Sequence, residues 1–478
     1  MNKPFQMELQ ALQPSRESGA PVYLQLYRRY REAIAAGKLR PGDRVPSVRS
    51  LASALNLARG TVEMAYQMLA GEGYFQARGA AGTVVSPGLA HVPEPLRART
   101  EDPAHAALRG QGMPGELLPF QLGLPALDAF PRKTWSRLAV RSLRTLEAAA
   151  MTYPPAAGHE PLRRAIASYL GISRGIACSH EQVFVTAGYR GALDLVCRTL
   201  LRPGDPGWYE DPGYIHARQF LERAGMRLQP VPVDDEGLDV AAGVRAADGA
   251  RFAVVTPTHQ SPTGVALSLP RRLALLAWAK RRQAWIIEDD YDSEFRYHGR
   301  PLPALKSLDT DGRVLYTGTF SKALLPGLRL AYLVVPMAQV GSFNDTLEHY
   351  PGPGAILPQA MVADFMDGGH FVRHLRKMRS LYAVRRGWLV DALARTLGER
   401  LHVQPQAGGL HVLAHLHAPH GDRALAAAAQ AAGLAINALS DWRLRPSPHG
   451  GLLMGFANFA TAAEAAAAVE RLTSVMHR

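Results

Sequence analysis

Residues 284–322 read AWIIEDDYDSEFRYHGRPLPALKSLDTDGRVLYTGTFSK, and this stretch decides the fold. It contains two short apolar runs, Ala284–Glu288 and Val314–Thr319. Continuous apolar runs of this length are typical of strands that are buried on both faces of a parallel sheet. Three similar runs alternate with helical patterns, at Gln182–Ala187, Arg251–Pro257 and Leu328–Pro336. This alternation predicts an α/β body with a mostly parallel sheet over residues 120–478.

The tail from about Leu401 has a different pattern, with short strands and alanine-rich helices at Ala424–Ala432 and Thr461–Val475. Alanine has the highest helix propensity, so both helical predictions rest on composition as well as on spacing. The tail is expected to form a smaller α+β subdomain of the body.

Polar residues stand at the ends of the predicted strands, where parallel α/β sheets bind ligands. Lys322 follows the run Val314–Thr319, Asp289 follows Ala284–Glu288, and Tyr291 comes two positions later. These residues suit a cofactor that carries an aldehyde and a pyridine ring. A lysine can bind the aldehyde covalently, a carboxylate can hold the ring nitrogen protonated, and a hydroxyl can face the ring oxygen.

The same cofactor needs an aromatic partner and a phosphate site. Tyr214 lies in a turn after a strand, and Gly188 and Tyr189 open a helix whose backbone N–H groups can face a phosphate. Hydroxyls and positive charge around the lysine come from Thr319, Ser321 and Arg329. Each residue alone has a commoner explanation, as a surface lysine, a helix-capping aspartate, a core tyrosine or a turn glycine. Their order and their places at strand ends favour a joint site.

The N-terminal part of the chain has another organisation. Residues 1–20 are expected to form a flexible arm, and residues 86–119 are rich in proline and predict an extended linker. Between them, residues 21–85 contain a helical pattern followed by two short helices with a tight turn. Ser47 is a good N-cap for the first of these, and the segments 74–77 and 82–85 have the size of a β-hairpin. This order predicts a winged helix-turn-helix.

A winged helix-turn-helix reads double-stranded DNA with the N-terminal end of its second helix. Arg59 and Thr61 stand at that end, Arg49 lies on the preceding helix, and Arg78 lies at the tip of the wing. A single arginine is more often a solvated surface charge, but the arrangement of the whole segment favours contacts with bases and phosphates. The formal net charge of +13 agrees with an anionic partner, although basicity alone shows only non-specific attraction.

Two family resemblances follow from these segments. Residues 21–85, PVYLQLYRRYREAIAAGKLRPGDRVPSVRSLASALNLARGTVEMAYQMLAGEGYFQARGAAGTVV, resemble the DNA-binding domain of GntR-type regulators. That family usually has a serine where Ala58 stands, and its loss is expected to cost about 1 kcal/mol of helix capping.

The segments VTAGYRGALDLV, YEDPGYIHAR, TPTHQSPTGVALSLPRR, IIEDDYDSEFRY and YTGTFSKALLPGLRLAY resemble the MocR subfamily of these regulators. The resemblance implies a fold-type I aminotransferase-like body that binds pyridoxal 5'-phosphate. It implies a covalent bond from Lys322, ring contacts from Asp289, Tyr291 and Tyr214, and a place for Ser261 beside the ring. The phosphate would be surrounded by Gly188, Tyr189, Ser321 and Arg329. Tyr153 would reach the phosphate in a partner subunit, which implies a homodimer.

One departure from the aminotransferase pattern concerns substrate binding. Transaminases usually carry an arginine for the substrate carboxylate in the strand that reads GLLMGF here, and Leu453 occupies that place. Arg443 and Arg445 lie upstream and are weak candidates to replace it, because exposed loop charges explain them at least as well. Ordinary transamination of amino acids is therefore doubtful.

Three functions remain open at this point. The leading hypothesis is a regulator whose body senses pyridoxal phosphate, an amine or an amino acid, and whose two readers bind an operator. The alternatives are a transaminase with an added DNA-binding arm and a dimerisation scaffold without cofactor. Two isolated cysteines and the absence of a signal or membrane pattern predict a cytoplasmic protein without a metal site.

Overall fold

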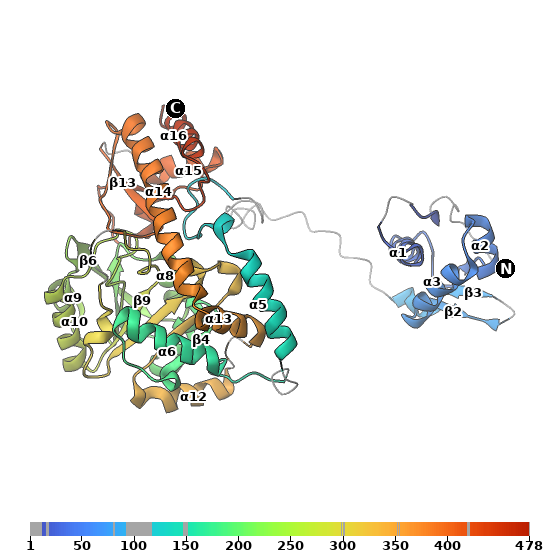
Figure 1. Ribbon diagram of the computed structural model, residues 1–478, viewed down its shortest axis with the longest axis horizontal. Coiled ribbons are helices and arrows are strands. Elements are labelled where there is room, and N and C mark those ends of the chain that lie inside the picture. The colour runs from blue at the N-terminus through green and yellow to red at the C-terminus, as the bar shows by residue number, and fades with distance from the viewer. Residues whose placement is uncertain are drawn as a thin grey trace. The chain divides into compact units, whose positions relative to one another are not determined.

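The computed structural model describes residues 12–15, 19–79, 82–91, 117–146, 152–297, 299, 302–350, 352, 354–417 and 421–477. The chain forms two compact units, Met1–Gly110 and Gln111–Arg478, whose elements are labelled in Figure 1. Most of the predicted arm and most of the predicted linker lie outside the described residues. No helix in the described ranges is both long and apolar enough to cross a bilayer.

The first unit is a winged helix-turn-helix. Its helices are α1 (Val22–Ala35), α2 (Val48–Leu55) and α3 (Arg59–Gly71). Its small antiparallel sheet has the order β1-β3-β2 and consists of β1 (Arg44–Val45), β2 (Phe75–Ala77) and β3 (Thr83–Val85). The sequence pattern did not predict β1, because a strand of two residues has no periodicity.

Three aromatic side chains hold this unit together. The rings of Tyr30, Tyr66 and Phe75 meet edge to face, with centroids 5.1–5.8 Å apart. The hydroxyls of Tyr30 and Tyr66 lie 3.2 Å apart, and the Tyr66 hydroxyl donates to the carbonyl of Pro46 at 2.9 Å. The aromatic core thereby fixes α3 against α1 and against the hairpin.

The second unit is built on an eight-stranded sheet with the order β4-β11-β10-β9-β8-β5-β6-β7. The strands are β4 (Val183–Thr186), β5 (Pro206–Asp211), β6 (Arg227–Asp234), β7 (Gly237–Leu238), β8 (Phe252–Val255), β9 (Trp285–Asp290), β10 (Val314–Thr319) and β11 (Ala331–Val334). The five strands β10, β9, β8, β5 and β6 are parallel, which confirms the predicted mostly parallel sheet.

The antiparallel strand β11 has a consequence for the site. It pairs with β10 on one side and with β4 on the other, so β4 runs in the same direction as β10. The carboxyl ends of β4, β5, β8, β9 and β10 therefore lie at one edge of the sheet. The segments that follow these five strands carry most of the predicted cofactor residues.

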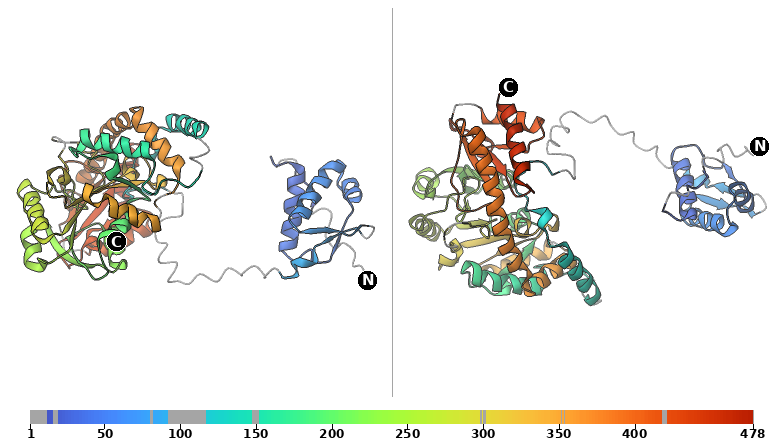
Figure 2. Two further views of the ribbon diagram at one scale, coloured as in Figure 1. Left: turned by 90° about the horizontal axis from the view of Figure 1, so that it is seen from below. Right: turned by 45° about the horizontal axis from the view of Figure 1, so that its top comes forward.

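The helices of this unit are α5 (Arg132–Thr145), α6 (Glu160–Arg174), α7 (Tyr189–Leu200), α8 (Ile215–Arg223), α9 (Val240–Ala247), α10 (Leu269–Arg282), α11 (Phe320–Ala323), α12 (Val340–His349), α13 (Ile356–Asp367) and α14 (His370–Leu397). The 28-residue helix α14 packs against α13 and continues to the C-terminal subdomain, as Figure 2 shows.

That subdomain has a four-stranded antiparallel sheet with the order β12-β13-β15-β14. It consists of β12 (Leu401–Val403), β13 (His411–Leu416), β14 (Asn437–Ala438) and β15 (Gly451–Gly455), with helices α15 (Asp422–Ala431) and α16 (Ala462–Met476). The predicted smaller α+β subdomain is thus confirmed.

Candidate functional site

The four predicted DNA contacts lie on the first unit. Arg59 is the first residue of α3 and is exposed, and Thr61 follows in the same turn. Arg49 is exposed on α2. Arg78 is exposed, and its backbone N–H donates to the carbonyl of Gly82 at 2.8 Å, which closes the wing. Charges in these positions remain solvated until a polyanion binds.

The two short helices differ in their caps as the sequence predicts. The hydroxyl of Ser47 accepts the N–H of Ser50 at 3.1 Å and caps α2. Ala58 begins α3 without a side-chain cap.

Sequence reasoning missed Arg44 on β1. Gly82 in the wing has φ +87°, and a Cβ there would meet the Arg44 guanidinium at 3.0 Å. Arg44 therefore adds positive charge to the wing. Only the pairing of β1 with β3 shows this.

Two predicted residues of the second unit occupy slightly different elements than expected. Asp289 lies inside β9 rather than after it, opposite Thr317 of β10. Lys322 lies in the short helix α11 and not at the end of the strand. Hydrogen bonds between neighbouring strands extend β9 by two residues, and no apolar pattern marks these residues because both are aspartates.

The amine of Lys322 is held at the sheet edge by one hydrogen bond. Its Nζ donates to the carbonyl of Gly123 at 2.6 Å. Gly123 has φ +77°, which strains any L side chain, and a Cβ there would lie 2.7 Å from Nζ and displace the amine. Burial lowers the pKa of Lys322, although the negative charges of Asp292 and Asp289 oppose this shift. A lowered pKa favours the neutral, nucleophilic form of the amine.

Asp289 is a buried carboxyl group with 7% of its surface exposed. Burial raises its pKa to about 8, and the nearby charges of Asp290, Glu210 and Asp292 act in the same direction, while Tyr189 opposes it. A buried carboxyl group in this situation needs a proton or a cation as its partner.

Tyr291 belongs to a buried chain of polar groups beside Asp289. Its hydroxyl lies 3.1 Å from Nδ1 of His259, and that Nδ1 lies 3.0 Å from Asp292 Oδ1. Gly409 with φ +91° packs on the ring of His259, where a Cβ would clash at 2.2 Å. Sequence reasoning missed His259, although it singled out Ser261, two positions later in the same segment.

Ser261 and its neighbour Gln260 hold the loop after β8. Gln260 Nε2 donates to Glu210 Oε2 at 3.0 Å and to the carbonyl of Pro212 at 2.8 Å. The backbone N–H of Ser261 donates to the hydroxyl of Thr256 at 3.0 Å. The loop therefore has one defined position beside Tyr291.

A polar cradle lies at the start of α7. Gly188 is the N-cap of α7 with φ +80°, and a Cβ there would lie 3.5 Å from the guanidinium carbon of Arg329. Arg329 itself donates to the carbonyl of Ala187 at 3.3 Å. The N–H of Ser321 donates to the hydroxyl of Thr319 at 3.1 Å, at the start of α11. Free N–H groups of a helix start beside a guanidinium suit a phosphate.

Three predicted residues are not brought into this arrangement. The side chain of Tyr153 is fully exposed. Arg445 is also exposed, and its backbone N–H donates to Asp211 at 3.1 Å. The carbonyl of Arg443 accepts a hydrogen bond from Arg218 at 2.9 Å. The last two contacts fix the backbone of this loop and do not direct either guanidinium to Lys322.

The position of the missing arginine is filled by apolar packing. Leu453 is completely buried and packs with Leu413, Leu439 and Trp442, and these four residues are called the Leu453 cluster. Tyr214, Ile215 and Leu122 pack against it. Leu122 directly precedes Gly123, the partner of Lys322.

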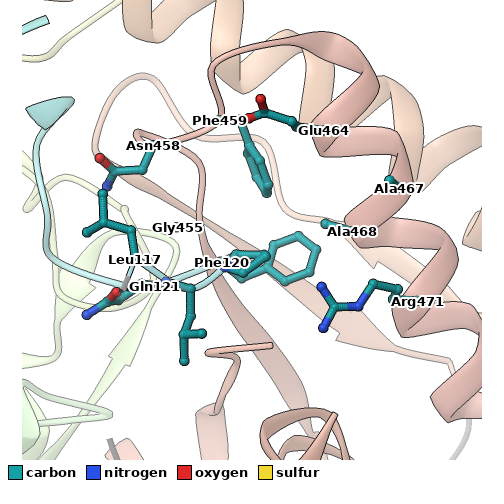
Figure 3. A pocket seen from close by; sticks show the side chains of 12 residues that line it. Leu117, Phe120, Gln121, Gly455, Asn458, Phe459, Glu464, Ala467, Ala468 and Arg471 are labelled. Carbon is teal, nitrogen blue, oxygen red and sulfur yellow. Dashed lines mark hydrogen bonds between the residues drawn. The ribbon is translucent and has the colours of Figure 1, made fainter. Parts of the chain in front are cut away.

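A separate pocket lies beside residues 117–121, the first described residues of the second unit (Figure 3). Phe120, Phe459 and Arg471 line it, with α16 on one side. Gly455 forms part of its wall, where a Cβ would lie 2.1 Å from the carbonyl oxygen of Gln121. None of the predicted cofactor residues lines this pocket.

Comparisons with known families and structures agree with both units. Residues 22–85 match the model of bacterial regulatory proteins of the gntR family, and residues 133–446 match the model of aminotransferase class I and II. The chain is similar to kynurenine aminotransferase of Pyrococcus horikoshii, solved with PMP, with a TM-score of 0.70, 25% identity, and coverage of 81% of this chain and 96% of that one. The chain is also similar to LysN, an α-aminoadipate aminotransferase from Thermus thermophilus. The TM-score is 0.69 and the identity 28%, with coverage of 79% of this chain and 95% of that one.

Relatives that contain both units are named as regulators. The probable rhizopine catabolism regulatory protein MocR of Rhizobium meliloti is 38% identical over 92% of this chain and 91% of its own length. The pyridoxine biosynthesis regulator PdxR of Corynebacterium glutamicum is 34% identical over 93% of this chain and 94% of its own length. The chain therefore belongs to the MocR group of GntR-family transcriptional regulators, whose aminotransferase-like body takes pyridoxal phosphate as its cofactor.

Proposed function

We propose that this regulator binds pyridoxal phosphate at the carboxyl edge of the large sheet, and that an amine effector bound there changes the affinity of the regulator for operator DNA. The observation that carries the proposal is the joint placement of Lys322, Asp289 and Gly188 at or just beyond the carboxyl ends of three strands that run in one direction. The proposed parts are a reader at 21–85, a linker at 86–119 and a body at 120–478, in a cytoplasmic protein.

The chain's own groups fit this cofactor. Asp289 is a buried carboxyl group without an arginine or lysine contact of its own in the described structure, so a protonated pyridine nitrogen would supply the missing cation. The start of α7 and Arg329 offer a cradle for the phosphate. When bound, the cofactor supplies an aldehyde that accepts an amine.

Each residue then has a definite task. Lys322 would bind the aldehyde, and an effector amine would compete with it for the same carbon. Tyr291, positioned by His259, would donate to the ring oxygen, and Ser261 would flank it. Tyr214 would cover the ring, and Tyr189 and Ser321 would complete the surroundings of Asp289 and the phosphate.

Two further points support a dimeric sensor. The fully exposed Tyr153 is a large side chain without cover in the single chain, as expected if it enters a partner subunit. The Leu453 cluster stands where a transaminase would bind a carboxylate, so efficient turnover of amino acids is not favoured. An effector changes DNA binding only through different affinities for two arrangements of the dimer.

The test uses the full chain. Purified protein is incubated with pyridoxal phosphate, and its visible absorption and its affinity for DNA duplexes selected by the protein itself are measured with and without added amines. We expect a new absorption band from the covalently held cofactor and an amine-dependent change in DNA affinity. Colourless protein after incubation would contradict the cofactor site, and steady amino-group transfer with unchanged DNA affinity would favour the transaminase alternative.

A further inference from the structure

One surface of the body, formed by α5 and the first part of α14, carries positive charge without negative charge. Both helices pack against α13 (Figure 1). The 14 residues of α5 include five arginines and lysines and no Asp or Glu. The first ten residues of α14, 370–379, include four more, and its first acidic residue is Asp391. These two short segments thus hold a large share of the formal net charge of +13.

The cations of the two helices meet around one pocket. Both helices line it, α14 with Arg373 and Lys377. Arg373 donates to the carbonyl of Gly368 at 2.9 Å, which holds its guanidinium without neutralising it. Burial and the positive charges of Arg373 and Arg137 lower the pKa of His370, so cations from α14 and α5 lie around the same ring. The exposed side chains that form this surface are called the basic patch, and they are Lys133, Arg137, Arg141, Arg373, Arg376 and Lys377.

The basic patch is extended along its helices. Lys133, Arg137 and Arg141 follow one another at intervals of four residues, so they share one face of α5, on the side away from its buried residues. At 1.5 Å per residue, this row spans about 12 Å along the helix axis. Arg373 and Lys377 repeat the same spacing on α14. Rows of cations suit a chain of phosphates, whereas a single small anion occupies one point.

The carboxyl groups of neighbouring elements do not neutralise the basic patch. Asp128, beside the start of α5, forms an ion pair with Arg385 at 2.6 Å. Asp364 of α13 accepts a hydrogen bond from the hydroxyl of Ser142 at 3.3 Å. Burial and the charge of Asp364 raise the pKa of Asp367, and no cation opposes this rise. In the part of the chain that the structure describes, no carboxylate forms an ion pair with the basic patch.

We infer that the basic patch binds the phosphate backbone of the DNA that the reader holds. This inference goes beyond the proposed function, and of that function it needs only the binding of DNA. Duplex DNA carries one negative charge about every 1.7 Å along its axis, and cations that replace its counterions gain affinity. A subunit interface would instead have to bury unpaired cations, which is unfavourable and uncommon in interface cores. The patch adds affinity for DNA of any sequence, while the reader contacts the bases.

The experiment measures binding of the full-length protein to a random-sequence duplex of about 40 base pairs, or roughly four helical turns, over a range of salt concentrations. The variant Lys133→Gln/Arg137→Gln/Lys377→Gln removes three cations of the patch. We expect its affinity at low salt to fall at least about tenfold, and the slope of log affinity against log salt concentration to become shallower by about 2–3. Its melting temperature should stay the same or rise, because fewer like charges repel one another.

Arg202→Gln/Arg251→Gln/Arg281→Gln is the matched control, since it removes three exposed arginines of the body that form no ion pair in the described structure. It should change the slope by less than about 1. An equal change of slope in the control would overturn the inference, as would an unchanged slope in the patch variant.

The alternative of a subunit interface has its own readout. If the patch variant loses the oligomeric state of the natural protein, measured by light scattering, the patch belongs to that interface and the inference is wrong. A natural protein that binds no duplex would overturn the proposed function and the inference together. Failure to take up pyridoxal phosphate would overturn the proposed cofactor site alone.

Discussion

The two units place their functional groups in opposite environments. In the reader, the side chains of Arg49, Arg59 and Arg78 are exposed, and the core consists of other residues. In the body, Asp289 is buried within the sheet and Lys322 is largely covered. The difference reflects the partners. A polyanion meets charges that are already solvated, whereas a small cofactor must be held by groups that folding has removed from water.

The largest expected effect concerns the buried groups of the body. Lys322→Ala should abolish the absorption band of covalently held cofactor, because no other amine is held at Gly123 in the described structure. DNA affinity measured without effector should remain. Lys280→Ala, which removes an exposed lysine paired with Asp311, should leave the band unchanged. A persistent band in the Lys322→Ala protein would show that the cofactor is attached elsewhere.

The pH dependence of stability is the next largest effect. Burial raises the pKa of Asp289 to about 8 and those of Glu210 and Glu288 to about 7 in the cofactor-free body. The folded body then retains protons that the unfolded chain releases above about pH 4, so its unfolding free energy falls as the pH rises through about 7–8. We expect the melting temperature of the body to fall between about pH 6 and about pH 9.

Asp289→Asn should flatten part of that fall, because it removes one of the groups concerned. A melting temperature that rises over the same pH range would contradict the raised pKa values and the burial that causes them.

The exposed side is tested by Arg59→Ala. If Arg59 contacts a base, its removal should weaken operator binding by about 1–3 kcal/mol and leave the melting temperature unchanged. Arg28→Ala, an equal loss of charge on the exposed side of α1, should have a smaller effect that is the same for all DNA sequences. Equal losses for the two variants would assign Arg59 to non-specific attraction.

Gly188→Ala tests the phosphate cradle through its backbone. Gly188 has φ +80° and ψ 176°, a backbone conformation that essentially only glycine adopts, so alanine there is expected to cost about 1–3 kcal/mol, and its Cβ would also approach the Arg329 guanidinium. Gly204 has a similar φ of +92° but no neighbour within 4 Å of a Cβ, so Gly204→Ala carries the strain alone. We expect both variants to lose stability and only Gly188→Ala to lose affinity for pyridoxal phosphate, measured by titration. Equal cofactor affinities would remove Gly188 from the site.

The smallest effect concerns the reader's missing cap. Ala58→Ser should stabilise α3 by about 1 kcal/mol, because a hydroxyl would accept an unsatisfied N–H of the first turn. Hydrogen exchange of α3 amides in the full chain measures this change. Slower exchange in α3 with unchanged exchange in the body is expected, and unaltered exchange in α3 would mean that another group already serves the helix start.

Several features followed from the sequence because they depend on neighbouring residues. Ser47 caps α2 and Ala58 leaves α3 uncapped, since a cap joins residues only three positions apart. The apolar runs predicted β4, β8, β9, β10 and β11. Proline and glycine interrupt β5 and β6, so neither shows an apolar pattern, although both are paired in the sheet.

The sequence by itself determined the two units, their secondary structure in outline and the kinds of residue that follow each strand, because these are properties of short segments. Only the tertiary structure decided which of those residues meet. The antiparallel strand β11 aligns β4 with β10 and brings Gly188 to Arg329, 141 positions away along the chain. The partners of His259 and Leu453 likewise come from other segments of the chain. Burial and charge act through space, so no local pattern could indicate the raised pKa of Asp289.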